Sequence, residues 1–503
     1  MQQLITDIPN QLNDVFGSLA YFKPELYLTV LFILVLLTDL IFRKNSTWLC
    51  RTIALIGMVL VLVMDLDQRV ELLKGTGTQY LFGNMLLLHK FAIQFKLVID
   101  VLTFILLLYF TWDNKLKAHK KGLSDLYTIV LGSVLGLHLM VMAVNLLSIF
   151  LAIEMVSLAS YLLVAYKSER LVSTEAGLKY VLFGAAASAI MLYGMSMIYA
   201  FTGSLSLGTG GQNIAQLAQV NPLSVSFALV FILLGIGFKL SFVPAHFWVP
   251  DVYEGAATPV TAYLSSLPKI TAFALLVNFV SPFAFYEGWH GFDFRLVLAI
   301  IGMITMVAGN FTAVLQNNVK RMLAYSGIGH TGFALMGIVT FTPEGLSALV
   351  FYLLVYGIGI IAALALANYF ENAEGITDVR EYKGLGFKYP LASVCFVMVL
   401  VSLTGIPVSA GFMGKVFVFS ATYSVYQHTH NVWLLAMMAT GALTTVVALF
   451  YYLKIPLNLF LKRTELLLSE NKWSIKIVVL AVVLALSLLV FGIFPDWLVS
   501  LLG

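Results

Sequence analysis

Stretches of about 20 mostly apolar residues recur from the first tenth of this chain to its last residues. An α-helix of that length crosses a hydrocarbon core of about 30 Å and satisfies its own backbone groups there. Hydrophobic residues make up 60% of the 503 positions and charged residues only 11%, whereas soluble chains are nearer half apolar. The pattern therefore predicts an all-α membrane protein and excludes a soluble enzyme.

The apolar runs divide into about fourteen predicted spans. The first 22 residues contain no lysine or arginine, so they do not resemble the start of a signal peptide, and the first span itself is expected to direct insertion. The predicted spans are 24–42, 48–66, 92–111, 123–142, 146–166, 174–200, 223–243, 256–281, 295–315, 323–341, 345–369, 389–423, 431–454 and 474–495. The twelfth of these is too long for one straight span.

The distribution of basic residues predicts the orientation. With the N-terminus outside, nineteen of the 29 lysines and arginines fall in inner loops. The outer segments carry five: Lys23, Arg69, Lys74, Lys90 and Arg295. The positive-inside rule therefore favours both termini on the outer side, which also agrees with an even number of spans.

The polar connections and the cysteines of this chain carry no binding motif. The segment 371–388 is a long inner connection, and the glycine-rich segment 203–213 lacks the lysine of a phosphate-binding loop, so it is expected to be a turn. The only two cysteines, Cys50 and Cys395, are isolated in sequence. They cannot ligate an iron–sulfur cluster, and a disulfide between them is not expected.

Two predicted spans contain helix-breaking residues next to a lysine. Gly235, Gly237 and Pro244 flank Lys239 in the seventh span, and a similar glycine- and proline-rich stretch, GIPVSAGFMG, precedes Lys415 in the twelfth. Each break frees backbone groups that must bind a partner or line a cavity at membrane depth. The two lysines are 176 residues apart, a spacing that fits a five-helix unit repeated once around a shared path. Packing alone also explains some glycine and proline in membrane helices.

Four ionisable residues lie well inside apolar spans: Glu154, Lys239, Lys269 and Lys415. A lysine near mid-membrane costs roughly 2.5–3.5 kcal/mol, so a set of them requires a function. Single acids and bases on separate helices are what a proton or ion relay needs. The alternatives are a protonated, packed Glu154 and lysines that snorkel to a helix end. The functional interpretation pairs Glu154 with Lys239 on a neighbouring helix.

Other candidates are weaker. Lys179 follows Glu175 by four residues and Lys96 precedes Asp100 by four, so both are interpreted as local pairs at the membrane rim. His330 and His246 are candidate relay imidazoles, with packing and helix capping as the respective alternatives, whereas His138 is interpreted as structural. His428 and His430 lie in an outer turn, and no histidine pair fits a haem or metal site. We therefore expect no redox chemistry in this chain.

Several motifs resemble subunit N of the bacterial proton-pumping NADH:quinone oxidoreductase, respiratory complex I, one of its antiporter-like subunits. The resemblance covers essentially the whole chain, and the wording PDVYEGA separates subunit N from its larger relatives. The segments that carry it are GFKLSFVPAHFWVPDVYEGAATPVTAYLSSLPKITAF (237–273), EMVSLASYLL (154–163), EAGLKYVLFGAAASAIMLYG (175–194), NVKRMLAYSGIGHTGFALMG (318–337) and GIPVSAGFMGKVFVF (405–419).

The resemblance implies fourteen helices with two inverted five-helix repeats, at 123–281 and 295–454, broken in the seventh and twelfth helices. A three-helix segment (1–122) precedes the repeats and a last helix (455–503) follows them. It implies that Glu154 and Lys239 form a functional pair, that Lys269 is the central lysine and Lys415 the terminal one. Lys179 matches a family lysine of less certain role.

The resemblance also implies a non-redox subunit of a proton-pumping translocase in the bacterial inner membrane. Its expected partners are the other membrane subunits and a peripheral arm. That arm holds flavin mononucleotide and iron–sulfur clusters and uses NADH and a quinone, while this chain binds no cofactor. A subunit of a multisubunit cation/proton antiporter, an autonomous secondary transporter and a structural spacer are the competing interpretations.

Overall fold

The computed structural model describes residues 2–42, 46–74, 77–119, 122–207, 212–284, 286, 289, 291–462 and 475–502. Within these residues, 12 helices are long and apolar enough to cross a membrane, and Pro390–Thr404 is a shorter apolar helix. Nearly all of the described chain is helical. The predicted all-α, multi-pass membrane architecture is therefore confirmed.

The long helices follow the predicted apolar runs closely, mostly within a few residues at each end. They are α2 (Lys23–Phe42), α3 (Ser46–Lys74), α4 (Lys90–Phe110), α6 (Ser124–Met142), α7 (Leu146–Val164), α8 (Leu171–Thr202), α10 (Pro222–Leu240), α12 (Thr258–Ala284), α13 (Phe294–Leu315), α14 (Val319–Ile338), α15 (Pro343–Glu374), α17 (Pro390–Thr404), α18 (Ala410–Thr429), α19 (Val432–Pro456) and α20 (Ile475–Ile493). The shorter elements are α5 (Asn114–Lys117), α9 (Gln212–Gln219), α11 (Trp248–Gly255), η2 (Val379–Tyr382), α16 (Leu385–Lys388), η3 (Leu457–Leu461) and α21 (Pro495–Leu502).

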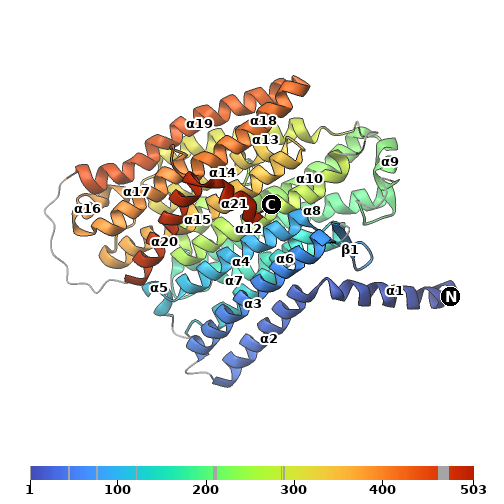
Figure 1. Cartoon of the computed structure of the whole chain (residues 1–503), viewed down its shortest axis with the longest axis horizontal. Helices are drawn as coiled ribbons and strands as arrows, with labels where there is room; N and C mark the ends of the chain where they lie inside the picture. The colour runs from blue at the N-terminus through green and yellow to red at the C-terminus, as the bar shows by residue number, and fades with distance from the viewer. Residues whose placement is uncertain are drawn as a thin grey trace.

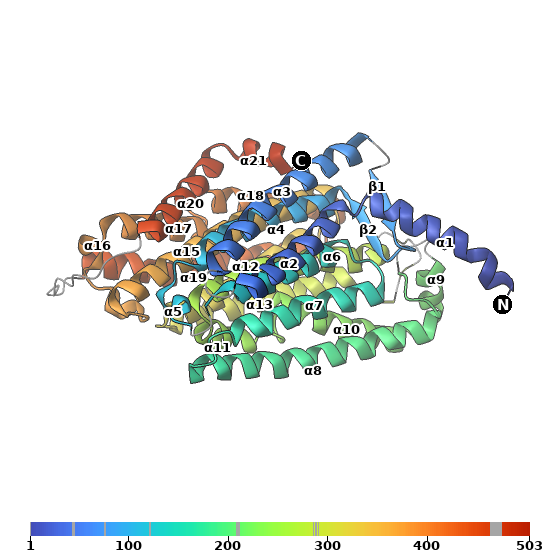
Figure 2. The same ribbon diagram turned by 90° about the horizontal axis from the view of Figure 1, so that it is seen from below.

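The long helices run side by side in an elongated bundle (Figure 1). In α12 and α15 every residue of the most apolar 18-residue stretch is buried, whereas only 28% of that stretch is buried in α2, α8 and α19. Figure 2 shows α8 along one edge of the bundle, with α12 and α15 inside it. Side chains on α12 and α15 are thus surrounded by protein, which is where an ionisable group must find protein partners.

Both predicted helix breaks are present. Helix α10 ends at Leu240, with Ser241 in the left-handed region at φ 63°, and the chain becomes helical again at Trp248. The predicted span 389–423 divides into α17 and α18, with Gly405 at φ 84° between them. Glycine adopts that conformation without the steric cost that a Cβ brings. The breaks place nonhelical backbone next to Lys239 and Lys415.

The sequence analysis missed two elements near the N-terminus. Helix α1 (Gln2–Ala20) precedes the first span and extends away from the bundle in Figure 1. Strands β1 (Thr78–Leu81) and β2 (Leu86–His89) form an antiparallel hairpin that follows α3. The dipeptide Gly-Asn between the strands is a usual hairpin signal. Of the predicted turn 203–213, residues 208–211 lie outside the described part of the chain, and Gly203 caps α8 in the left-handed conformation.

Helices α13 and α14 approach each other closely because glycines face glycines. A Cβ on Gly309 would lie 2.4 Å from the backbone nitrogen of Gly329 and 2.8 Å from the Tyr325 carbonyl oxygen. Likewise, a Cβ on Gly332 would lie 2.5 Å from the carbonyl oxygen of Gly302. Without a hydrophobic force between helices in lipid, such close backbone packing is a main source of stability.

We therefore expect Gly309→Ala to destabilise the protein by about 1–3 kcal/mol, since the added methyl group meets backbone and not a mobile side chain. The measurement is thermal unfolding of the purified full chain in detergent. Gly17→Ala is the control, because nothing lies within 4 Å of that Cβ position. Equal unfolding temperatures for the two variants would contradict this account of α13–α14 packing.

Candidate proton-relay site

Lys239 lies in the last turn of α10, and its side chain is 4% exposed. Within the described chain its Nζ has no hydrogen-bond partner. Three aromatic rings surround it instead, with centroids 5.7 Å away for Tyr161, 5.5 Å for Tyr180 and 5.6 Å for Phe238. The ring faces attract a cation, but they accept no ordinary hydrogen bond. This ammonium is therefore held without a fixed acceptor.

Glu154 projects from α7 and is only partly buried. Its Oε1 accepts a hydrogen bond from the hydroxyl of Ser188 on α8. The predicted ion pair with Lys239 is not formed between these described side chains. Tyr161, seven residues after Glu154 on the same face of α7, is the residue that reaches Lys239. Both side chains contact α8, Glu154 through Ser188 and Lys239 through Tyr180, but they form no direct ion pair in this conformation.

Lys269 is in the middle of α12 and is 1% exposed. Its Nζ donates to the carbonyl oxygen of Gly327 on α14 at 3.0 Å. A Cβ on Gly327 would lie 2.9 Å from the Tyr356 hydroxyl and 3.4 Å from Lys269 Nζ. Glycine at this position therefore leaves room where the lysine, the tyrosine hydroxyl and the backbone of α14 meet.

His330 lies one turn after Gly327 on α14. Its Nδ1 is 2.7 Å from the hydroxyl of Tyr352, and its Nε2 is 3.2 Å from the hydroxyl of Tyr452. A tyrosine hydroxyl both donates and accepts, so this pair of contacts suits either neutral tautomer. The Tyr452 hydroxyl also bonds that of Ser326. His330 is thus bonded on both ring nitrogens to proton-carrying groups.

Lys415 lies in the second turn of α18, just past the break. Its Nζ donates to the carbonyl oxygen of Thr404 at 2.8 Å and to Oγ1 of Thr445 at 3.1 Å. A cavity of about 20 Å³ is lined by Lys415, Thr445, His330 and Tyr352, among others. That volume suffices for one water molecule, and the lining is polar. The helix break therefore supplies Lys415 with a backbone acceptor and with space for water.

One turn of α14 contacts all three lysine regions. Gly327 accepts from Lys269, and His330 shares the cavity with Lys415. Thr331 donates to the carbonyl oxygen of Leu240 at 2.9 Å, at the broken end of α10 next to Lys239. The sequence analysis proposed His330 but missed Gly327, Thr331 and the tyrosines. Its only signal there was the run of small and polar residues in SGIGHTG.

Lys179 pairs with Glu175 at 2.9 Å, as the spacing predicted, and also with Asp251 of α11 at 3.0 Å. Asp251 in turn pairs with Arg321 of α14 at 2.8 Å. Burial alone would raise the pKa of the Asp251 carboxyl, but the hydrogen bonds from Arg321 and Lys179 outweigh it and hold that pKa below its usual value. His246 lies in the break after α10, and its Nδ1 has no partner among the described residues.

The predicted local pair between Lys96 and Asp100 is wrong. Both side chains are buried, at 0% and 1% exposure, because α3, α6 and α12 pack around α4. Lys96 Nζ lies 2.7 Å from Glu25 Oε1, 2.5 Å from Asp65 Oδ1 and 2.7 Å from Gln68 Oε1. The local spacing of four residues predicted the wrong partner, since residues on other helices hold the ammonium.

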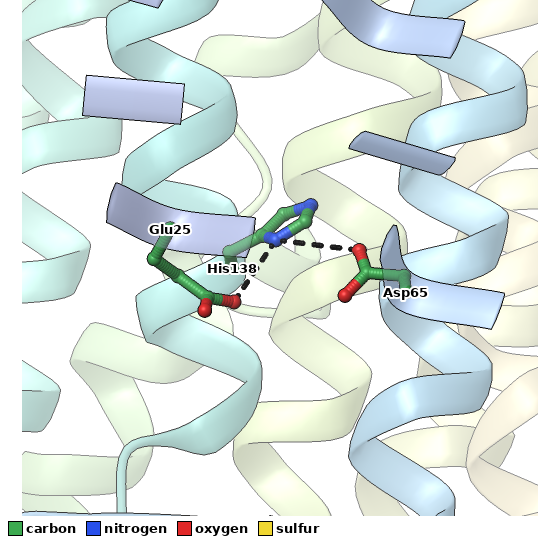
Figure 3. A group of neighbouring side chains, drawn as sticks. All are labelled: Glu25, Asp65 and His138. Atoms are coloured by element: carbon green, nitrogen blue, oxygen red, sulfur yellow. Dashed lines mark hydrogen bonds and ion pairs between the residues drawn. The ribbon is translucent and has the colours of Figure 1, made fainter. Parts of the chain in front are cut away.

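His138 belongs to the same buried group. Its Nδ1 lies 3.3 Å from Glu25 Oε1 and 3.9 Å from Asp65 Oδ2, as the dashed lines in Figure 3 mark, and its Nε2 lies 3.1 Å from Asp100 Oδ1. We call Glu25, Asp65, Lys96, Asp100 and His138 the N-terminal cluster. The sequence signal for it was available, because these five ionisable residues stand in four successive apolar runs, two of them in the run of α4.

The comparisons of this chain with known proteins identify one family. Residues 143–440 match the family described as NADH:quinone oxidoreductase/Mrp antiporter, TM. The chain is 36% identical over 495 residues to the NADH-quinone oxidoreductase subunit N 2 of Chloroherpeton thalassium, covering 96% of this chain and 94% of that protein.

Solved structures with the same fold include a chain of respiratory complex I from Thermus thermophilus with bound aureothin. That match has a TM-score of 0.76 and 27% identity and covers 95% of this chain and 99% of that one. A chain of the Mrp complex from Dietzia sp. DQ12-45-1b superposes with a TM-score of 0.81 at 21% identity, covering 96% of each chain. At that identity the likeness concerns the fold alone.

The two kinds of buried lysine predict opposite effects on stability. Lys239→Met removes an ammonium that lacks an acceptor, so we expect the free energy of unfolding to rise by about 1 kcal/mol or more. Lys96→Met leaves buried carboxylates without their cation and is expected to cost about 3–5 kcal/mol. Thermal unfolding of the purified full chain measures both. Destabilisation of similar size in the two variants would refute the distinction.

Proposed function

Because the chain belongs to the subunit N family of NADH-quinone oxidoreductases, we propose that it translocates protons across the membrane within such an enzyme. The observation that carries this proposal is the row of buried lysines Lys239, Lys269 and Lys415, joined through one turn of α14. In this proposal NADH, flavin mononucleotide, iron–sulfur clusters and quinone act in other subunits. The partners are the neighbouring membrane subunits and the peripheral arm.

The first step concerns Glu154 and Lys239. Quinone reduction elsewhere in the complex changes the field at this pair, bringing the carboxylate toward the ammonium or away from it. With Glu154 bonded to Ser188, release of the Lys239 proton breaks no hydrogen bond to any described residue. Moving one charge against 100 mV costs about 2.3 kcal/mol, a cost within reach of forming or breaking one buried ion pair.

The later steps use the contacts of α14. Lys269 receives the proton, and His330, bonded to Tyr352 and Tyr452, carries it toward the cavity beside Lys415. A water molecule there connects the imidazole to the lysine, from which the proton leaves the membrane. Lys179 and His246 lie near the inner end of this path, where uptake from the rim is their proposed role.

The proposal includes the organisation of the chain. Residues 1–122 form an N-terminal segment, residues 123–281 and 295–454 form two inverted repeats, and residues 455–503 form the last part. The two broken helices, each ending next to a lysine, support this division. We also propose that the protein resides in the bacterial inner membrane with both termini on the outer side.

The second candidate function is that of a subunit of a multisubunit cation/proton antiporter, favoured by the fold shared with the Mrp chain. Purification of the detergent-solubilised assembly separates the two. Mass spectrometry is expected to detect flavin- and iron–sulfur-bearing partners with this chain. Sodium-dependent proton flux in vesicles, without NADH-linked activity, would instead establish the antiporter function.

We expect Lys239→Ala and Glu154→Gln to lower the number of protons pumped per NADH oxidised by about tenfold or more in the assembled enzyme, because each removes a group that holds or releases the proton. The measurement compares acidification of inverted membrane vesicles with NADH consumption. The control is Lys383→Ala, at an exposed lysine of the 371–388 connection. Undiminished pumping in assembled Lys239→Ala enzyme would leave a structural spacer as the explanation.

The orientation has its own test. In a Cys50→Ser, Cys395→Ser background, a single cysteine is placed at Glu344 or at Lys383, both of which are exposed. A membrane-impermeant maleimide applied to spheroplasts is expected to label Glu344→Cys and to spare Lys383→Cys until the membrane is opened. The reverse labelling would invert the proposed topology.

A further inference from the structure

We propose that the N-terminal cluster is a second proton-binding site of this chain, separate from the lysine row, that takes up and releases one proton. The cluster joins α2, α3, α4 and α6, and its five side chains are between 0% and 1% exposed. No role in the relay was assigned to any of its members above. The proposal follows from their charges and from which of their atoms lack partners.

The charges do not balance unless a carboxyl group is protonated. Glu25, Asp65 and Asp100 bring three negative charges, while Lys96 brings one positive charge and His138 at most one more. A net charge buried away from water costs several kcal/mol even after relaxation. With Lys96 and His138 both protonated, one further proton makes the cluster neutral.

The contacts of His138 support the protonated imidazole. Its two ring nitrogens both face carboxylate oxygens, at 3.3 Å from Glu25 Oε1 and 3.1 Å from Asp100 Oδ1. A neutral ring has one N–H and one lone pair, so one nitrogen would point its lone pair at a carboxylate. The imidazolium donates in both directions and satisfies both contacts.

The remaining proton has places to bind. Among the described residues, Glu25 Oε2, Asp100 Oδ2 and both oxygens of Asp65 are buried without a well-aligned hydrogen bond, although Asp65 Oδ1 lies close to the Lys96 ammonium. Asp65 Oδ2 lies 3.9 Å from His138 Nδ1, too far for a good hydrogen bond. Buried polar atoms are normally satisfied, so these oxygens identify where the cluster accepts a proton. Binding forms a carboxylic O–H bond, and release transfers that proton to water.

A metal ion is the competing occupant, since ligand atoms of Glu25, Asp65 and His138 lie within 4.8 Å of one another. Lys96 argues against it. Its Nζ lies within 2.7 Å of three oxygens, one each from Glu25, Asp65 and Gln68, which matches its three N–H donors. The ammonium thus occupies the position that a cation would take between the two carboxylates.

The cluster lies toward one end of the helices that form it. Glu25 is in the first turn of α2, Lys96 is in the second turn of α4, and His138 is in the last turns of α6. Strand β2 leads directly into α4 at this end. The proposed route for the proton is therefore the short one past this end, beside the hairpin, whereas the lysine row lies on α10, α12 and α18.

The test is an infrared difference spectrum of the purified, assembled complex across a pH step. The wild type is expected to gain or lose the carbonyl band of one protonated carboxylic acid. Asp100→Asn is expected to lose this band although Glu25 and Asp65 remain, because two carboxylates balance Lys96 and His138 without a further proton. Asp67→Asn, at an exposed aspartate on the same helix as Asp65, is the control that keeps the band.

A band that persists in Asp100→Asn overturns the proposal and leaves a fixed ion-pair network. A band that responds to added sodium at constant pH overturns it in favour of a cation site. Should Asp100→Asn not assemble, Glu25→Gln makes the same change in charge on another helix and must give the same loss. Because the readout is a protonation state and not pumping, failure here does not affect the relay proposed above, and failure of the relay does not affect this site.

Discussion

The cost of placing an ammonium group where no water solvates it determines much of this structure. A buried lysine needs acceptors, and most helical carbonyls are bonded within their helix and shielded by side chains, so it must reach a helix end or a carbonyl with room for a second donor. Lys415 finds its carbonyl where α17 ends, at Thr404, and Lys269 bonds the carbonyl of Gly327, where the missing Cβ leaves room. The helix break and this glycine are thus parts of the lysine sites.

Helix α14 connects these sites because its small residues allow close approach on two sides. Its glycines let the backbone of α13 pack directly against one face. On the other side, Gly327, His330 and Thr331 reach Lys269, the cavity of Lys415 and the end of α10. Larger side chains at these positions would separate the helices and lengthen each contact beyond hydrogen-bond distance. The contacts that link the three lysine sites therefore depend on packing as much as on charge.

The sequence predicted what depends on local pattern. Apolar runs located the spans, glycine and proline located both breaks, and the spacing of Glu175 and Lys179 predicted a real ion pair. It failed where partners are remote: Lys96 binds Glu25 and Asp65, 71 and 31 residues away, and not Asp100, four residues away. The acceptor of Lys269 is a backbone carbonyl, which carries no side-chain signal. Which helices become neighbours, and at what depth, is decided by packing of the whole chain.

Lys96 and Lys239 are both buried lysines, but the surroundings of their ammonium groups differ. Lys96 Nζ lies within 2.7 Å of oxygens from Glu25, Asp65 and Gln68, so losing its proton would break strong contacts and leave carboxylates uncompensated. Three aromatic rings surround the Lys239 ammonium, and no described residue accepts a hydrogen bond from it. A relay requires groups of the second kind, since a proton moves only from sites whose protonated and deprotonated forms are close in free energy. The unsatisfied ammonium that weakens the fold is therefore the one suited to transport, while the satisfied one ties α4 to α2 and α3.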